Sequence, residues 1–195
     1  MAKKKPTEVT PELLTEMKRF YAERTKKHIR TVQGWGTKIN EEFNERFDMT
    51  SHDLSKYSPI ELEPYIYLTW RYRCPSEGDE QFIVTDEMEA RILAACTHHV
   101  QNNRHHPEYW DDKYNGEDNG IVDGTKMPKD AIAEMCADWM AMSTELGGCP
   151  LEWFKLCNYT GTNNPEKTQH TFTHEQQVLI TKYLSIYHKY TRTEG

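Results

Sequence analysis

The chain has 195 residues, of which 36% are hydrophobic and 28% charged, with a formal net charge of −7. This length suits one domain with a substantial core, and the acidic balance argues against a protein whose main task is binding nucleic acid. No apolar run is long enough to cross a membrane, and the basic start lacks the apolar stretch of a secretory signal. We therefore expect a cytoplasmic protein with a flexible basic tail over residues 1–9.

The cysteine pattern agrees with a reducing compartment. The number of cysteines is odd and they form no Cys-x-x-Cys pair, which argues against a disulfide framework and against a thiolate zinc site. The five residues are Cys74, Cys96, Cys136, Cys149 and Cys157.

The first helix is expected to begin at Thr10-Pro11, where a capping residue precedes a proline. Hydrophobic residues then recur every three or four positions through residue 32, and His28 lies on this stripe. Gly34 and Gly36 are expected to end the helix, and a short second helix should follow over 39–47.

The middle of the chain continues the helical pattern. We expect His52 and Asp53 to open a helix, and the capping box over 58–61 to start another. Beyond a loop near residues 74–80, a strong helix is expected from residue 86, with His98 and His99 in its last turns.

The C-terminal part begins with an acidic loop over 111–127, which we interpret as a mobile segment or lid. A long helix is expected from Pro128 to Leu146, then a short one after Pro150 and a last one from Thr173. Alternation with a period of two residues is scarce. The sequence therefore predicts an all-α fold in one compact domain over 10–195, with a core over 10–146 and extra C-terminal helices over 150–190.

The side chains that carry chemistry are unevenly distributed. Adjacent His52 and Asp53 can both reach one cation if the backbone bends toward it, and imidazole and carboxylate suit several transition metals. Asp138 lies partly on the inward side of its helix, where an unpaired carboxylate costs several kcal/mol. Its partner is therefore a metal, a helix-terminal amide or an arginine.

The order His28, His52-Asp53, Asp138 on separate helices resembles the signature of the HD superfamily of metal-dependent phosphohydrolases. The resemblance covers residues 10–146. It implies an all-α core in which these four side chains bind a divalent metal.

Two basic residues extend the resemblance. Several HD branches carry His-Asp-x-Gly-Lys, with the lysine near a substrate phosphate, and Lys56 stands at the matching position while Ser55 replaces the glycine. Lys56 follows Asp53 by one helical turn, on the same face. We expect Lys56, and Arg24 one turn before His28, to bind the phosphoryl oxygens of a substrate.

The segment over 98–110 is also similar to a group of uncharacterised microbial and phage HD-like proteins, which carry His-His followed by Asn-x-His-His-x-x-Tyr-Trp. Binuclear HD enzymes place two further histidines in this interval. We therefore expect His99 and His106 to bind a second metal, and His98 and His105 to contact substrate or to orient the ligands.

The resemblance implies hydrolysis of a nucleotide or other small phosphorylated metabolite, with a metal-activated water as nucleophile and Asp53 and Lys56 as catalytic groups. The cofactor would be one or two ions of manganese, zinc, iron, cobalt or nickel per chain. Two alternatives remain: an HD-fold di-iron oxygenase, and a non-catalytic protein that binds metal or a nucleotide. The sequence leaves the oligomeric state, the substrate and a bacterial or viral origin open.

Simpler interpretations exist for the single residues. His28 fits a hydrogen-bonded core histidine, Asp53 a carboxylate at a helix start, and Lys56 a surface lysine. Glu134, four residues before Asp138, is a ligand, a general base or a solvated residue, the last being the commonest case. Residues 115–126 imitate a calcium loop, but a lysine stands where the bidentate glutamate is required.

Overall fold

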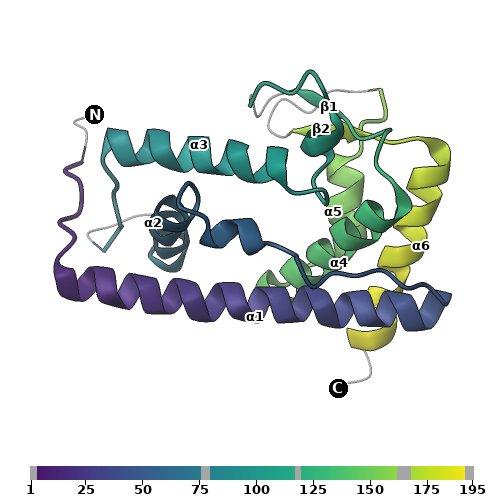
Figure 1. The fold of residues 1–195 in the computed structure, drawn as a ribbon, viewed down its shortest axis with the longest axis horizontal. Helices are drawn as coiled ribbons and strands as arrows, with labels where there is room; N and C mark the ends of the chain where they lie inside the picture. Colours follow the sequence, from purple (N-terminus) through teal and green to yellow (C-terminus); the bar gives the residue numbers. More distant parts are fainter. Residues whose placement is uncertain (1–3, 76–79, 117–119, 162–167, 192–195) are drawn as a thin grey trace. The chain divides into compact units, whose positions relative to one another are not determined.

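The computed structural model describes residues 4–75, 80–116, 120–161 and 168–191. Helices dominate this part of the chain, with one small two-stranded sheet, which confirms the all-α prediction (Figure 1). The elements are α1 (Pro11–Phe43), the 3-10 helix η1 (Leu54–Tyr57), α2 (Leu62–Arg73), α3 (Asp86–Asn102), the 3-10 helix η2 (Pro107–Trp110), β1 (Ile121–Asp123), α4 (Lys129–Leu146), α5 (Pro150–Cys157), β2 (Gln169–Thr171) and α6 (His174–Thr191).

The contacts within the chain divide it into two compact units, each built from two separate stretches. The first unit comprises residues 1–27 and 53–99, and the second comprises 28–52 and 100–195. The division does not follow the boundary near residue 146 that we expected between a core and extra C-terminal helices.

The predicted helix starts are formed by side chains that bind the first free backbone amides. Thr85 Oγ1 accepts a hydrogen bond from the Met88 amide at 3.1 Å at the start of α3. At the start of α6, Thr173 Oγ1 accepts from the Gln176 amide while Gln176 Oε1 accepts from the Thr173 amide, a reciprocal capping box. Gly147, with φ of 79°, ends α4 as expected.

The expected break at Gly34 and Gly36 was wrong, because α1 continues through both to Phe43. A Cβ atom on Gly36 would stand 2.2 Å from Met49 Sδ, so this glycine makes room for the chain that follows the helix. Asn44, with φ of 52°, ends the helix in the left-handed conformation often taken by glycine.

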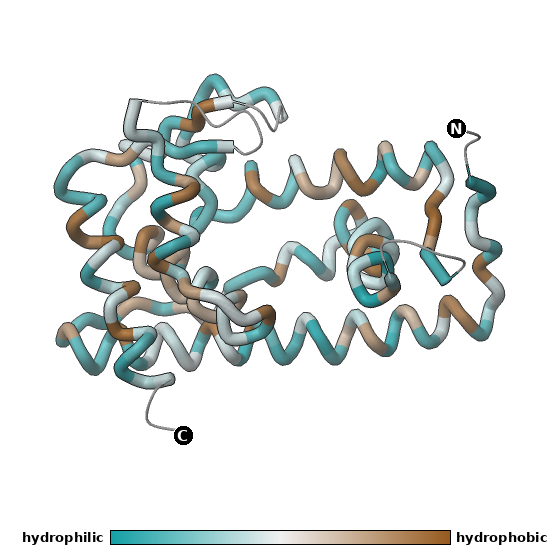
Figure 2. Tube along the Cα trace, turned by 180° about the vertical axis from the view of Figure 1, so that it is seen from behind, coloured by the Kyte–Doolittle hydropathy of each residue, from teal (hydrophilic) through white to brown (hydrophobic). Residues whose placement is uncertain are grey.

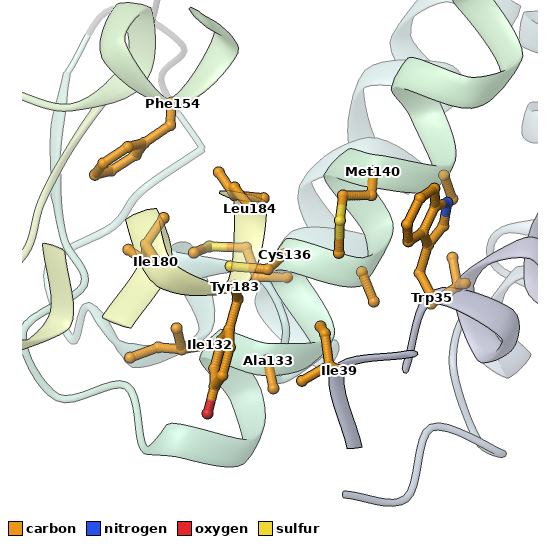
Figure 3. Close-up of a cluster of buried hydrophobic side chains, with 14 of the residues drawn as sticks. Trp35, Ile39, Ile132, Ala133, Cys136, Met140, Phe154, Ile180, Tyr183 and Leu184 are labelled. Atoms are coloured by element: carbon orange, nitrogen blue, oxygen red, sulfur yellow. The ribbon is translucent and has the colours of Figure 1, made fainter. Parts of the chain in front are cut away.

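The second unit has a core that joins α4 to α6 and to the C-terminal part of α1. Ile180, Tyr183 and Leu184 of α6 are fully buried against α4, where Cys136 and Met140 are equally enclosed (Figure 3). The middle of α4 is therefore anchored in this core, and Glu134 and Asp138 project from that anchored part of the helix.

The first unit has two smaller cores. One joins Met17 and Tyr21 of α1 to Ile66 and Trp70 of α2, and the other joins Leu68 of α2 to Met88 and Ile92 of α3. Figure 2 shows hydrophobic residues recurring among hydrophilic ones along α1 and α3, as expected for helices that bury one stripe.

The short sheet was not predicted. β1 pairs in parallel with β2, with Val122 opposite His170, so part of the expected acidic loop is ordered as a strand. Three residues give too short an alternation to be recognised in a sequence. Residues 117–119 of that loop lie outside the described residues.

The described part of the expected N-terminal tail is held by hydrogen bonds. The Thr7 amide donates to the Ile83 carbonyl at 2.8 Å, and the Ile83 amide donates to Thr7 Oγ1 at 2.9 Å. Residues 1–3 of the tail lie outside the described residues.

Among the helices of the described residues, none combines the length and apolar character that crossing a membrane requires.

The two glycines of α1 provide a matched test of the packing at Met49. Gly34→Ala should stabilise the protein by about 0.5–1 kcal/mol, because its Cβ would meet no atom within 4 Å and alanine favours a helix. Gly36→Ala should be less stable than Gly34→Ala by about 1–3 kcal/mol, because the added methyl group forces Met49 to move. Urea unfolding of both variants measures the difference, and equal stability would contradict the close packing.

Candidate metal centre

Three side-chain atoms converge inside the second unit. His28 Nε2 lies 3.1 Å from Asp138 Oδ1 and 3.4 Å from His52 Nε2, and His52 Nε2 lies 3.9 Å from Asp138 Oδ1. The point equidistant from the three atoms is about 2.0 Å from each, which matches the length of metal bonds to imidazole nitrogen and carboxylate oxygen. The three residues therefore fit one transition-metal ion.

The local structure explains why these atoms meet. His28 belongs to α1 and Asp138 to α4, two helices that share the core of the second unit. His52 follows a turn in which its own amide donates to the Met49 carbonyl at 3.3 Å. Because Met49 is itself buried in that core, the imidazole of His52 is only 1% exposed.

Glu134 contacts the ring nitrogen of His52 that faces away from His28 and Asp138. It stands one helical turn before Asp138 on α4, and its Oε1 lies 2.8 Å from His52 Nδ1. A hydrogen bond from Nδ1–H to the carboxylate leaves a lone pair on Nε2, the atom that faces His28 and Asp138. A carboxylate that binds the outer nitrogen of a ligand histidine is the usual support of a metal site.

The same carboxylate also binds His105. His105 Nδ1 lies 3.2 Å from Glu134 Oε1, and its ring centroid is 4.3 Å from that of His52. From the sequence Glu134 was interpreted as a ligand, a general base or, most commonly for such a residue, a solvated glutamate. Its position one turn before Asp138 was the available signal.

The carboxylates of Glu134 and Asp138 are both charged at neutral pH. Burial alone would raise the pKa of Glu134, but hydrogen bonds from His105 and His52 outweigh it and hold the pKa at about 2. Burial is likewise outweighed at Asp138, where the adjacent His28 lowers the pKa well below its ordinary value. Two adjacent, largely enclosed negative charges favour a bound divalent cation.

The first unit contains a second polar network, centred on Asp53. This residue adopts the left-handed conformation, with φ of 59°, which is uncommon outside glycine. It precedes η1 but makes no side-chain capping bond. Its carboxylate instead contacts Lys56 Nζ at 2.5 Å and His99 Nε2 at 3.2 Å.

Glu61 completes this network and was missed by the sequence analysis, which assigned it to a capping box. The expected bond from the Glu61 amide to Ser58 Oγ is present at 3.3 Å. The fully buried carboxylate turns away from it, however, and lies 2.7 Å from His98 Nδ1 and 2.9 Å from His99 Nδ1.

His99 bridges the two buried carboxylates through its two ring nitrogens. Burial alone would lower its pKa, but hydrogen bonds to Asp53 and Glu61 outweigh it, so the pKa of His99 lies above its ordinary value of 6.5. Both nitrogens can donate only in the imidazolium form. The charge on His99 and that on Lys56 therefore offset the two carboxylates.

The structure groups the predicted residues by unit. His28, His52 and Asp138 meet in the second unit with His105, whereas Asp53 and Lys56 meet in the first unit with His98 and His99. The binding of one metal by His28, His52, Asp53 and Asp138 together stays a prediction. The binding of a second metal by His99 and His106 also stays a prediction.

Two predicted residues have other surroundings. His106 Nδ1 is 3.9 Å from Glu108 Oε2, and the other oxygen of Glu108 is 3.1 Å from His170 Nε2, a residue without any signal in the sequence. Arg24 is half-buried on the part of α1 that belongs to the first unit.

Comparison with known proteins gives one match. The model of a family described as "Family of unknown function (DUF5662)" matches residues 17–192, which is most of the chain. No curated protein and no solved structure matches the sequence.

Replacing Glu134 tests whether it supports the metal ligands. Glu134→Gln keeps the size of the side chain but weakens its hydrogen bonds to His52 and His105, so metal affinity should fall about 10- to 100-fold. Competition with a chromogenic chelator measures the affinity. Glu145→Gln, an exposed site on the same helix, should leave it unchanged, and equal affinities of the two variants would contradict the role of Glu134.

The network of the first unit predicts a pH-dependent stability. Because the pKa of His99 is raised by folding, its contribution is full below pH 6.5 and is lost as the pH rises through the folded pKa. Glu61, whose pKa is lowered against the opposing effect of burial by its bonds to His99 and His98, contributes above its ordinary value of 4.5. In chelator-treated protein, wild type should therefore exceed His99→Gln in melting temperature most between about pH 5 and 6.5. A difference that grows toward alkaline pH would exclude a charged His99.

Proposed function

The chain belongs to the DUF5662 family, and we propose that it is a metal-dependent hydrolase of phosphate esters or anhydrides. The observation that carries the proposal is the convergence of His28 Nε2, His52 Nε2 and Asp138 Oδ1 on a point about 2.0 Å from each. Two imidazoles and one carboxylate leave coordination positions for water and substrate, as in catalytic rather than structural metal sites.

The protein side chains have distinct roles in this proposal. His28, His52 and Asp138 hold the ion, and Glu134 keeps His52 in the tautomer that presents Nε2. A bound divalent cation polarises a phosphoryl oxygen and lowers the pKa of a water toward neutrality. The two histidines are buried and Asp138 is largely enclosed, so charges act strongly at this site.

Phosphoryl transfer is supported by the sequence as well as by the donor set. The ligands occur in the order of the HD signature, and Lys56 follows Asp53 as the phosphate-binding lysine does in several HD branches. In the structure Lys56 Nζ lies 2.5 Å from the Asp53 carboxylate. We propose a nucleotide or another small phosphorylated metabolite as the substrate class.

A second candidate is an iron-dependent oxygenase. Two histidines and one carboxylate with open positions form the ligand set of many non-haem iron enzymes, and His28, His52 and Asp138 make up such a set. Bound iron, an absorption change with dioxygen and no phosphate release would favour this candidate.

Asp138→Asn tests the proposed hydrolase directly. The amide lacks the negative charge that balances the ion, so metal content and phosphate release should both fall by about two orders of magnitude. Elemental analysis gives the metal content, and a panel of nucleotides with manganese, magnesium, cobalt or zinc gives the activity. Asp130→Asn, on an exposed turn of the same helix, is the control and should retain both.

Full metal content and activity in Asp138→Asn would remove this residue from the site. Metal binding without phosphate release in the wild-type protein, under all four metals, would contradict the hydrolase and leave the metal centre in place.

A further inference from the structure

A pocket in the second unit lies beside the candidate metal centre. It has a volume of about 470 Å³ and is formed by the C-terminal half of α4, the turn at Gly147-Gly148 and the start of α5. This volume lies in the range of small-molecule sites, which are concave and mainly apolar. Asp138, one of the three converging ligands, is among the residues that line it.

The pocket walls expose large apolar side chains. Trp139 and Met142 line the α4 side, and Trp153 and Leu156 line the α5 side. Trp153 is 43% exposed and Leu156 49% exposed, as is usual for a binding surface and costly for one that only meets water. Trp139 packs against the buried Phe154 at a ring-centroid distance of 6.2 Å, which fixes this wall to the core.

The glycine turn leaves space beside these walls. A Cβ atom added to Gly147 or to Gly148 would meet no atom within 4 Å. Both residues have positive φ, at 79° and 102°. Glycine therefore permits the turn that closes α4, and the absence of side chains there keeps the pocket open.

The charges of the lining orient a ligand. The charged side chains in the pocket are the carboxylates of Asp138 and Glu152, and Glu152 is already paired with Lys155 at 2.7 Å. A phosphate would be repelled from this lining and attracted to a cation held by His28, His52 and Asp138. The part of the substrate that enters the pocket is therefore not anionic, and the apolar walls favour an apolar group.

We propose that this pocket binds a planar apolar ring of the substrate, whose phosphate end is held at the metal centre beside Asp138. This inference rests on the proposed function, and it narrows the substrate class to phosphate esters or anhydrides that carry an aromatic group. The two indoles of Trp139 and Trp153 supply flat surfaces on which such a ring can stack.

A comparison of two non-hydrolysable probes tests the ring site. Binding of (1-naphthylmethyl)phosphonate and methylphosphonate to the metal-loaded protein is measured by calorimetry. The naphthyl probe should bind at least about tenfold more tightly, because only its ring buries apolar area against the indoles. Trp153→Ala should abolish most of this preference, and Tyr72→Ala, an exposed aromatic residue in the first unit, should retain it.

Cys149 gives a second readout that is independent of catalysis. It lines the pocket, and its Sγ lies 3.3 Å from His188 Nε2. The naphthyl probe should slow alkylation of Cys149 by iodoacetamide, followed by mass spectrometry of its peptide, and methylphosphonate should not. Cys74 is also half-exposed but lies in the first unit. Iodoacetamide should alkylate it at the same rate in the presence of either phosphonate.

The outcomes separate the ring site from the hydrolase. Equal affinity of the two phosphonates, or a preference that survives Trp153→Ala, overturns the ring site even if phosphate esters are hydrolysed. A Trp153-dependent preference together with no phosphate release supports the ring site and contradicts the hydrolase. If Trp153→Ala changes the oligomeric state in solution and leaves the affinity for both probes unchanged, a second copy of the chain covers this face. That result would also overturn the proposal.

Discussion

Two carboxylates one turn apart on α4 are the constraint on which the second unit depends. Glu134 and Asp138 lie in the middle of a helix that packs against the main core, and their side chains are only 17% and 16% exposed. An uncompensated buried charge is costly enough to unfold a domain of marginal stability. The imidazoles of His28, His52 and His105 contact these carboxylates. The resulting geometry leaves a position for a cation.

In the first unit the buried carboxylates are neutralised by cationic side chains. Asp53 and Glu61 are at most 1% exposed, and they are offset by Lys56 and by a protonated His99. The protein thus supplies its own positive charge in this unit. In the second unit Glu134 and Asp138 contact histidines, whose neutral form is a metal ligand. This difference is the physical reason for placing the candidate metal on the second set.

The left-handed backbone of Asp53 fits this account. A non-glycine residue in this conformation costs of order 1 kcal/mol, and such strain is concentrated at functional sites. The turn lets His52 and Asp53, which are adjacent in the chain, each join the polar network of a different unit.

The sequence predicted the helices well because their starts are marked by local chemistry. Thr85 and Thr173 bind backbone amides within their own first turn, a signal that needs no knowledge of the rest of the chain. The role of Gly36 depends on Met49, which approaches only in the folded protein, and the three-residue strands depend on pairing between distant segments. Such non-local contacts leave little trace in a local pattern.

The candidate site shows the same limit. His28, His52 and Asp138 were identified from their order and helical positions, and they do converge. Glu134 and Glu61 were undervalued, because nothing local distinguishes a glutamate that binds a histidine from one that faces water. Which of the adjacent histidines turns inward depends on the exact end of α3. His105, expected to contact substrate or to orient the ligands, contacts Glu134.

The most direct test of the account is the metal content of the purified, untagged wild-type protein beside that of His28→Ala, His52→Ala and Asp138→Ala. The account predicts at least one transition-metal ion per chain in the wild type and loss of that ion in each variant, with the helical circular dichroism retained. Wild-type protein that binds no metal under any condition, or variants that keep full occupancy, would show that the convergence of these three side chains is purely structural.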